Sequence, residues 1–255
     1  MADVEQFSAW QLRDRQVSAA IVTRRLSTLN SFYKWALKQE VVEGNPVYLA
    51  DKPKRPLRIP VWLERDAQAR LEATLKDRRN LPINIFGNNQ ERMTETRRRY
   101  ELLFGLLLNS GLRISEALGL KVADVRLVDG TARSVRVIGK GNKERLVPLP
   151  EAFSQVFGFW LKDQPRGEFV FARTAGQKPV SSQAARAYLR GMVQKAGIDK
   201  RISPHKLRHT YATNLLNAGA ERVDIKALLG HESIATTQIY TNVGQERMEK
   251  VVSKL

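Results

Sequence analysis

The chain of 255 residues contains no cysteine, which excludes disulfides, thiolate metal sites and a cysteine nucleophile. It also lacks any apolar run close to the roughly 18–20 residues that a membrane helix needs. The N-terminus does not show the basic-then-apolar pattern of a signal peptide. We therefore expect a soluble, cytoplasmic protein with no membrane partner. The sequence has no G-x-x-x-x-G-K-S/T phosphate loop either, so ATP is not implied.

Acidic residues are few compared with basic ones. There are 26 Asp and Glu against 43 Lys and Arg, a formal net charge of +17, and the excess is larger after residue 112. A soluble protein this basic usually faces a polyanion, and counterion release from phosphates makes nucleic acid the leading partner. Charge alone leaves open a solvated basic surface, a ribosomal protein or a membrane-surface protein. At 42% hydrophobic, the chain has enough apolar residues to bury a core.

The first part of the chain divides from the rest at a proline-rich stretch. Residues 3–43 have apolar positions at three- and four-residue steps, which predicts helix, and Gly44-Asn45-Pro46 is a stop signal. Residues 51–60 then carry three prolines and four cations, which favours an extended linker. We therefore expect a helical domain at 1–52, a linker at 53–60 and a second domain at 61–255.

The second domain mixes helical segments with one hairpin. Helices are predicted at 100–109, 151–162 and 181–196, and the polar stretch 77–99 is typical of a long loop. Residues 133–149 change to a strand, turn, strand pattern, with Gly139 and Gly141 in the turn. The predicted fold class is mainly α with a small antiparallel β-sheet (α+β).

A first candidate functional segment is 111–116 (GLRISE). Arg113 follows an apolar helix, so we expect it to be poorly exposed, and a buried guanidinium needs an anionic partner. Glu116 lies about one helical turn further on and can be that partner. Taken alone, such a pair is more often a structural ion pair than part of a functional site.

The second segment is 203–209 (SPHKLRH), which has the signature of a helix start. Ser203 suits the N-cap and Pro204 the first helical position. His205 and Arg208 are three residues apart, so they share a face in the first turn, where backbone N–H groups favour an anion. The alternatives are an ordinary basic helix start and, for His209, a packed histidine.

Two further segments contain residues that can act on a phosphate. Residues 228–231 (LLGH) end a predicted helix at His231, and Tyr240 follows nine residues later. The chain has only three histidines. Singly, a histidine or tyrosine on an apolar helix is most often a core or surface residue.

The order of these segments resembles the tyrosine recombinase family. The resemblance covers about residues 100–245 and rests on Arg in GLRISE, Lys in GKGN, then HKLRH, LLGH and Tyr. Residues 137–149 are especially similar to Xer-type recombinases, and the chain also resembles compact phage and plasmid integrases. The resemblance implies a site-specific DNA recombinase that works through a 3′-phosphotyrosyl intermediate and a Holliday junction.

The resemblance also implies roles for individual residues. Tyr240 would attack the scissile phosphate, while Arg113 and Arg208 would hold its non-bridging oxygens and stabilise the transition state. Lys140 would protonate the 5′ oxygen, with Lys143 as a nearby alternative.

The remaining roles are supporting ones. His205 and His231 would hydrogen-bond the phosphate and assist proton movement, and Glu116 would orient the site without touching DNA. No cofactor and no metal are implied, because the two guanidiniums and the lysine supply the positive charge.

The N-terminal region departs from the family pattern. Family members usually carry a four-helix, SAM-like core-binding domain, whereas only about 50 residues precede the linker here, so this domain is expected to be shortened. No separate arm-type DNA-binding domain is expected. The stretch 77–99 is interpreted as a surface insertion, and its end at Arg97, Arg98 and Arg99 as a possible contact with the DNA backbone.

The tail at 245–255 carries an apolar stripe at helical steps, formed by Met248, Val251, Val252 and Leu255. It can pack on its own domain or on a neighbouring subunit, and we favour the second, as part of a tetramer on double-stranded DNA. An accessory or partner recombinase is an open alternative. Rival functions are a type IB topoisomerase and a non-catalytic DNA-binding module.

Overall fold

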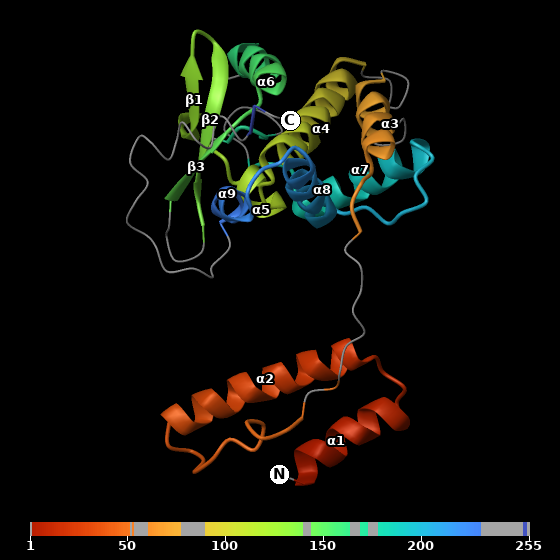
Figure 1. Ribbon diagram of the computed structural model, residues 1–255, viewed down its shortest axis with the longest axis vertical. Coiled ribbons are helices and arrows are strands. Elements are labelled where there is room, and N and C mark those ends of the chain that lie inside the picture. Colours follow the sequence, from red (N-terminus) through yellow and green to blue (C-terminus); the bar gives the residue numbers. More distant parts are fainter. Residues whose placement is uncertain are drawn as a thin grey trace. The chain divides into compact units, whose positions relative to one another are not determined.

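The computed structural model of the protein describes residues 2–51, 53, 61–77, 90–139, 144–163, 169–172, 178–230 and 252–253 (Figure 1). The chain divides into two compact units, Met1–Ile59 and Pro60–Leu255, each with its own hydrophobic core. The division lies within the stretch expected to be a linker. Within the described ranges, no helix is both long and apolar enough to cross a membrane.

The N-terminal unit is built from two helices, α1 (Ala2–Arg13) and α2 (Ala19–Lys38). The expected helical region is therefore interrupted by a turn, in which Gln16 adopts a left-handed φ of 49°. After α2, Asn45 fixes the returning chain, because its amide donates to Asn30 Oδ1 at 2.8 Å. The small core of the unit consists of Val4, Val22, Leu26 and Val47.

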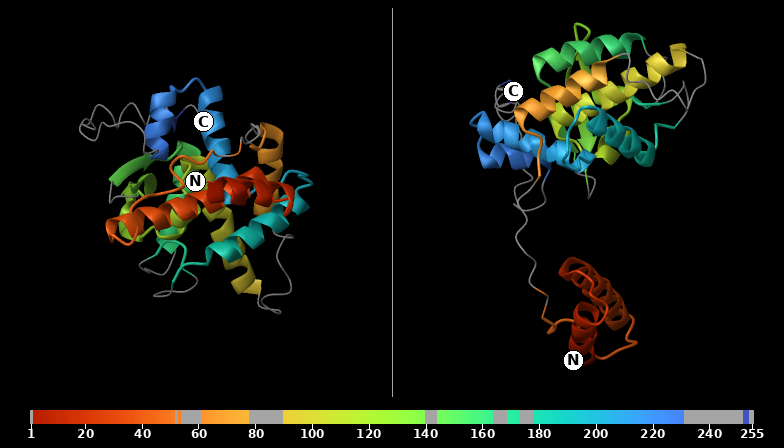
Figure 2. Two further views of the ribbon diagram at one scale, coloured as in Figure 1. Left: turned by 90° about the horizontal axis from the view of Figure 1, so that it is seen from below. Right: turned by 90° about the vertical axis from the view of Figure 1, so that its right-hand side faces the viewer.

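The C-terminal unit is organised around α4 (Gln90–Ser110), which runs through its middle in the ribbon views (Figures 1 and 2). It packs against α3 (Arg65–Lys76), α5 (Ile114–Leu118), α6 (Glu151–Asp163) and α8 (Pro204–Asn217). The apolar helix predicted at 100–109 is confirmed. Its fully buried side chains include Leu103, Phe104, Leu106 and Leu107.

The loop expected at 77–99 is wrong in its second half, because α4 already includes residues 90–99; residues 78–89 lie outside the described part. Arg97 and Arg99 are buried, 7% and 3% exposed, and form ion pairs with glutamates of the same helix. Arg97 also donates to the Lys76 carbonyl at 2.7 Å. Both side chains are used inside the protein, which contradicts the expectation that they contact DNA.

A three-stranded antiparallel sheet covers one side of this unit, in the order β1 (Val125–Val128), β2 (Thr131–Ile138) and β3 (Glu144–Pro148). The short 3₁₀ helix η1 (Val122–Asp124) leads into it. The register pairs Val135 with Val147, which confirms the two predicted strands, while residues 140–143 of the expected turn lie outside the described part. The helix α6 packs against β2 (Figure 1).

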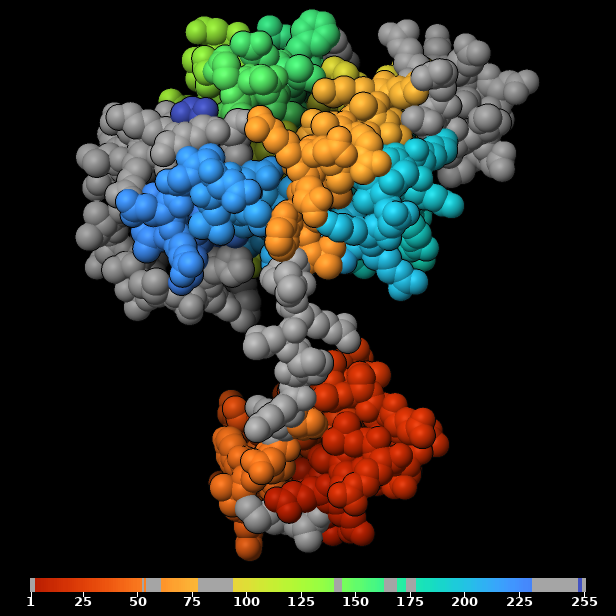
Figure 3. All heavy atoms as spheres, turned by 45° about the vertical axis from the view of Figure 1, so that its right-hand side comes forward, coloured from red at the N-terminus to blue at the C-terminus, as the bar shows by residue number. Residues whose placement is uncertain are grey.

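The helices α7 (Ser182–Lys195) and α9 (Arg222–Leu229) complete the unit. Figure 3 shows the chain from residue 61 onward (orange) lying between the blue surface of α8 and α9 and the cyan surface of α7. The Leu63 N–H donates to Thr210 Oγ1 at 2.9 Å, so the chain entering this unit is fixed directly to α8.

A left-handed turn at Gly111 ends α4. Its φ is +61°, and a Cβ placed there would overlap the Tyr211 ring and lie 2.7 Å from Leu229 Cδ2. Glycine is needed for two independent reasons, the backbone conformation and the close approach of α8 and α9. The turn therefore fixes how the ends of three helices meet.

Replacing Gly111 by Ala is expected to lower the free energy of unfolding by about 2–4 kcal/mol, since strain and overpacking add. Urea denaturation of the full chain, followed by circular dichroism, measures the change. Gly191→Ala is the matched control: Gly191 lies inside α7 with open space at its Cβ position. It should raise stability by about 0.5–1 kcal/mol. Equal effects of the two substitutions would contradict the account of Gly111.

Candidate active site

The helix α8 begins as its sequence predicts, with Ser203 in the N-cap position and Pro204 at the first helical position. The Ser203 carbonyl accepts from the Lys206 N–H at 2.8 Å, although its hydroxyl makes no cap bond. His205 is exposed in the first turn, and its ring lies edge-on to that of His209, with centroids 4.6 Å apart. Burial, with the nearby charges of His205 and Arg208, lowers the pKa of His209 below its ordinary value.

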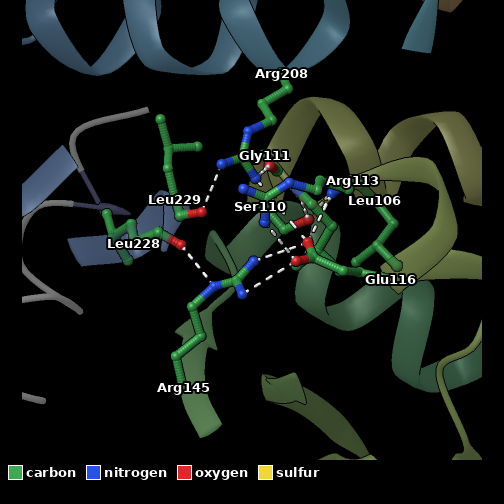
Figure 4. Close-up of polar contacts among 10 residues, drawn as sticks. Leu106, Ser110, Gly111, Arg113, Glu116, Arg145, Arg208, Leu228 and Leu229 are labelled. Atoms are coloured by element: carbon green, nitrogen blue, oxygen red, sulfur yellow. Dashed lines mark hydrogen bonds and ion pairs between the residues drawn. The ribbon is translucent and has the colours of Figure 1, made fainter. Parts of the chain in front are cut away.

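Arg208 runs from α8 into the interior, where its side chain is 4% exposed. Its guanidinium donates to the Gly111 carbonyl at 2.8 Å and to the Leu229 carbonyl at 2.5 Å (Figure 4). Burial, followed by the charge of Arg113, lowers the pKa of Arg208 to about 10, so it remains charged at neutral pH. The backbone carbonyls thus hold a buried cation in a fixed position.

Arg113 occupies the N-cap position of α5, directly after the turn at Gly111. Its backbone N–H donates to Glu116 Oε2 and its guanidinium to Glu116 Oε1, both at 2.8 Å, so the expected partner is confirmed. The expected burial is wrong, because the Arg113 side chain is 44% exposed. The reason is that α4 ends at Ser110 and the chain turns at Gly111, so Arg113 does not continue the buried face of α4.

Glu116 lies at the centre of the cluster, with a side chain only 7% exposed. Arg145 of β3 donates to both carboxylate oxygens, at 2.8 and 3.2 Å, and Arg208 Nη1 is 4.0 Å away. Burial alone would raise the pKa of Glu116, yet the hydrogen bonds from Arg145 and Arg113 lower it below its ordinary value. One ionised carboxylate therefore holds together three arginines from three elements (Figure 4).

Arg145 is the functional candidate that the motifs did not identify. Its Nε also donates to the Leu228 carbonyl at 3.0 Å, so it links β3 to the end of α9. A signal exists in the sequence: strand alternation places Arg145 on the same face as the buried Val147, and an inward arginine needs an anion. The identity of that anion, 29 residues earlier in the chain, has no local signal.

Three of the predicted residues lie outside the described part of the chain: Lys140, His231 and Tyr240. The strands on either side of residues 140–143 are described, and so is Gly230, which ends α9 with a left-handed φ of +64° just before His231. The structure thus brings Arg113, Glu116 and Arg208 together. It places His205 exposed, one turn before Arg208 on α8.

Metal ligands do not gather in the described ranges, where no cluster of three or more histidine or carboxylate side chains occurs. The described cluster has the opposite character, with three guanidiniums around one carboxylate. Such an arrangement suits an anion with several oxygens, because arginine can donate to two of them at once.

Comparison with known proteins gives the family. The sequence model described as "Phage integrase family" matches residues 85–247, more than half of the chain. The "Tyrosine recombinase XerC" of Halalkalibacterium halodurans is 34% identical over 254 residues, covering 94% of this chain and 77% of the relative. The "Tyrosine recombinase XerD" of Oceanobacillus iheyensis is 31% identical over 248 residues, with the same coverage of both chains.

Solved structures give the same fold. The XerH site-specific recombinase bound to a palindromic difH substrate, in a post-cleavage complex, has a TM-score of 0.67 at 22% identity and covers 98% of this chain and 71% of its own. The XerA recombinase has a TM-score of 0.54 at 25% identity and covers 98% and 81%.

Replacing Glu116 by Gln is expected to lower the free energy of unfolding at pH 7 by about 3 kcal/mol, because buried guanidiniums lose their counter-charge. The folded-state pKa of Glu116 is lowered, so its contribution is present above the unfolded-state pKa and disappears as pH falls through the folded-state pKa. The difference in stability between the unsubstituted chain and Glu116→Gln should therefore shrink as the pH falls below the ordinary pKa of a glutamate, about 4.3.

Urea denaturation of both chains at a series of pH values measures this gap. Glu151→Gln is the control, since Glu151 pairs with Arg133 but is 57% exposed. It should change stability by less than about 1 kcal/mol at any pH. A Glu116→Gln penalty that stays constant with pH would contradict an ionised, stabilising Glu116.

Proposed function

Because this chain belongs to the phage integrase family, whose matched relatives are tyrosine recombinases, we propose that its arginine cluster binds the DNA phosphate that Tyr240 attacks. The protein is a site-specific recombinase that cleaves and rejoins DNA strands. Its partner is double-stranded DNA, on which it acts in the cytoplasm. The reaction proceeds through a 3′-phosphotyrosyl intermediate and a Holliday junction.

The observation that carries the proposal is the meeting of Arg113 and Arg208 around one buried carboxylate. Arg208 is fixed by two carbonyls and Arg113 is 44% exposed, so one cation is rigid and the other accessible. Both guanidiniums are held by groups of the protein itself, which is the preorganisation that transition-state stabilisation requires. His205, exposed in the first turn of the same helix, extends the anion-binding surface.

The chemistry needs no external energy source. The Tyr240 oxygen forms a bond to phosphorus while the bond from phosphorus to the 5′ oxygen breaks, and the phenolic proton passes to a histidine of the site, His205 or His231. Lys140 supplies the proton that the 5′ oxygen takes up, and His231 hydrogen-bonds the phosphate. A 5′ hydroxyl from another strand then reverses the reaction and releases the tyrosine. One phosphodiester replaces another, so ATP is not required, and the two arginines with Lys140 would supply the positive charge that a metal ion would otherwise bring.

We expect both units to contact the DNA duplex. The N-terminal unit would act as a shortened, SAM-like core-binding domain, while the C-terminal unit carries the chemistry. Most contacts are expected to reach phosphates, with sequence read by a few base contacts and by the deformability of the site. Four chains would assemble on two recombination sites, with or without a partner recombinase.

Replacing Tyr240 by Phe should abolish covalent attachment to DNA while leaving DNA binding intact, because only the nucleophilic oxygen is removed. The assay mixes the full chain with a suicide duplex, nicked beside a candidate site from its own replicon, and separates the products on a denaturing gel. A band of slower mobility should form with the unsubstituted chain and disappear with Tyr240→Phe.

Tyr211→Phe is the matched control. Burial raises the pKa of Tyr211 and encloses its hydroxyl, so this tyrosine is unsuited to attack and its variant should still form the band. Binding without any band on native DNA would favour a non-catalytic module. A band accompanied by relaxation of supercoils, with no recombinant product, would favour a type IB topoisomerase.

The tail gives a separate test of assembly. Val252 is 1% exposed within the core cluster of the C-terminal unit, so a single chain has a binding place for this part of its tail. In the tetramer the tail would occupy that place on a neighbouring subunit. Deleting residues 245–255 should then abolish recombination and spare DNA binding, as measured by product formation and gel shift. Loss of the folded circular dichroism spectrum would instead assign the tail to its own unit.

A further inference from the structure

All three nitrogens of Arg145 are engaged inside the protein. Nη1 and Nη2 donate to the two oxygens of Glu116, at 3.2 and 2.8 Å, and Nε donates to the Leu228 carbonyl at 3.0 Å. The side chain is only 13% exposed. Arg145 is therefore committed to contacts within the protein, with Glu116 and Leu228, in contrast to the accessible Arg113 (Figure 4).

The first consequence concerns charge. Glu116 has two oxygens and three guanidiniums within 4.0 Å. Because Arg145 covers both oxygens, Arg113 makes a single side-chain bond to Oε1 and keeps much of its surface open. Without Arg145, the buried carboxylate would be under-neutralised, would draw more strongly on Arg113 and would repel an approaching phosphate.

The second consequence concerns the end of α9. Its last two carbonyls, of Leu228 and Leu229, accept from Arg145 and Arg208, and a cation at a helix C-terminus is favourable. A Cβ on Gly230 would lie 3.0 Å from Nη1 of Arg145, so the left-handed turn rests on this guanidinium. The residue after that turn is His231.

We propose that Arg145 is a positioning residue for DNA cleavage: it neutralises Glu116 so that Arg113 stays available to the scissile phosphate, and it fixes the turn that leads into His231. This inference rests on the proposed function, because it assigns Arg145 to the same reaction. Arg145 touches no substrate itself and acts through Glu116 and the α9 terminus.

The test is single-turnover cleavage of the nicked suicide duplex by the full chain. Arg145→Gln should slow formation of the covalent complex by about 10²-fold, as expected for a misplaced catalytic group. Its affinity for the uncleaved duplex should stay close to that of the unsubstituted chain. Arg145→Lys keeps the charge but cannot reach both Glu116 and Leu228, so its rate should be intermediate.

A second substitution separates the charge effect from general damage. If Arg145 acts by neutralising Glu116, the double variant Arg145→Gln/Glu116→Gln should cleave faster than Arg145→Gln alone, because the uncompensated carboxylate is gone. Arg133→Gln is the matched control. It removes an arginine of the neighbouring strand whose side chain is 47% exposed and paired with Glu151, and its cleavage rate should be unchanged.

Each outcome has a distinct meaning. Slow cleavage by Arg145→Gln, recovered by Glu116→Gln, supports the proposal. Two results would overturn this inference and leave the proposed function standing. One is a normal cleavage rate in Arg145→Gln, and the other is a slow rate that the added Glu116→Gln substitution leaves unchanged. If Arg145→Gln does not fold, a normal rate in Arg145→Lys overturns the proposal and an intermediate rate supports it. No covalent complex with the unsubstituted chain overturns the proposed function, and this inference with it.

Discussion

The carboxylate of Glu116 is the contact on which the described part of the site depends. Three positive charges from α5, β3 and α8 would repel one another at these distances, and the nearly buried carboxylate is what allows them to meet. Through Arg145 and Arg208 the same cluster reaches the last carbonyls of α9. One anionic group therefore joins four elements that are far apart in sequence. The hydrogen bonds from Arg145 and Arg113 that hold the cluster together also lower the pKa of Glu116.

Local sequence patterns predicted the parts of this structure that have local causes. Apolar spacing gave α6 and α7, Ser203 and Pro204 marked the start of α8, and Arg113 with Glu116 lie only three residues apart. The start of α4 was missed because Arg97 and Arg99 are buried as ion pairs, so the helix has no apolar stripe there. The exposure of Arg113 depends on the left-handed turn before it.

Long-range contacts had no such pattern. Arg145 meets Glu116 and Leu228, 29 and 83 residues away, and Arg208 binds carbonyls that every residue type possesses. Hydrogen bonds to main-chain carbonyls therefore cannot be predicted from residue types. The assignments of Lys140, His231 and Tyr240 stay predictions, since they rest on resemblance and lie outside the described residues. The reaction is inferred from membership of the phage integrase family. The geometry adds that Arg208 is held by main-chain carbonyls whereas Arg113 is accessible.

The use of main-chain carbonyls as anchors also affects how this site tolerates change over evolution. The carbonyls of Gly111, Leu228 and Leu229 remain after almost any substitution at those positions, so mutation cannot easily remove the acceptors. What mutation can alter is the path of the backbone that presents them, and at position 111 even one added carbon is excluded. The side chains of Leu228 and Leu229 are themselves buried, so substitution there would act on the site through packing and the backbone path and not through loss of the hydrogen-bond acceptors.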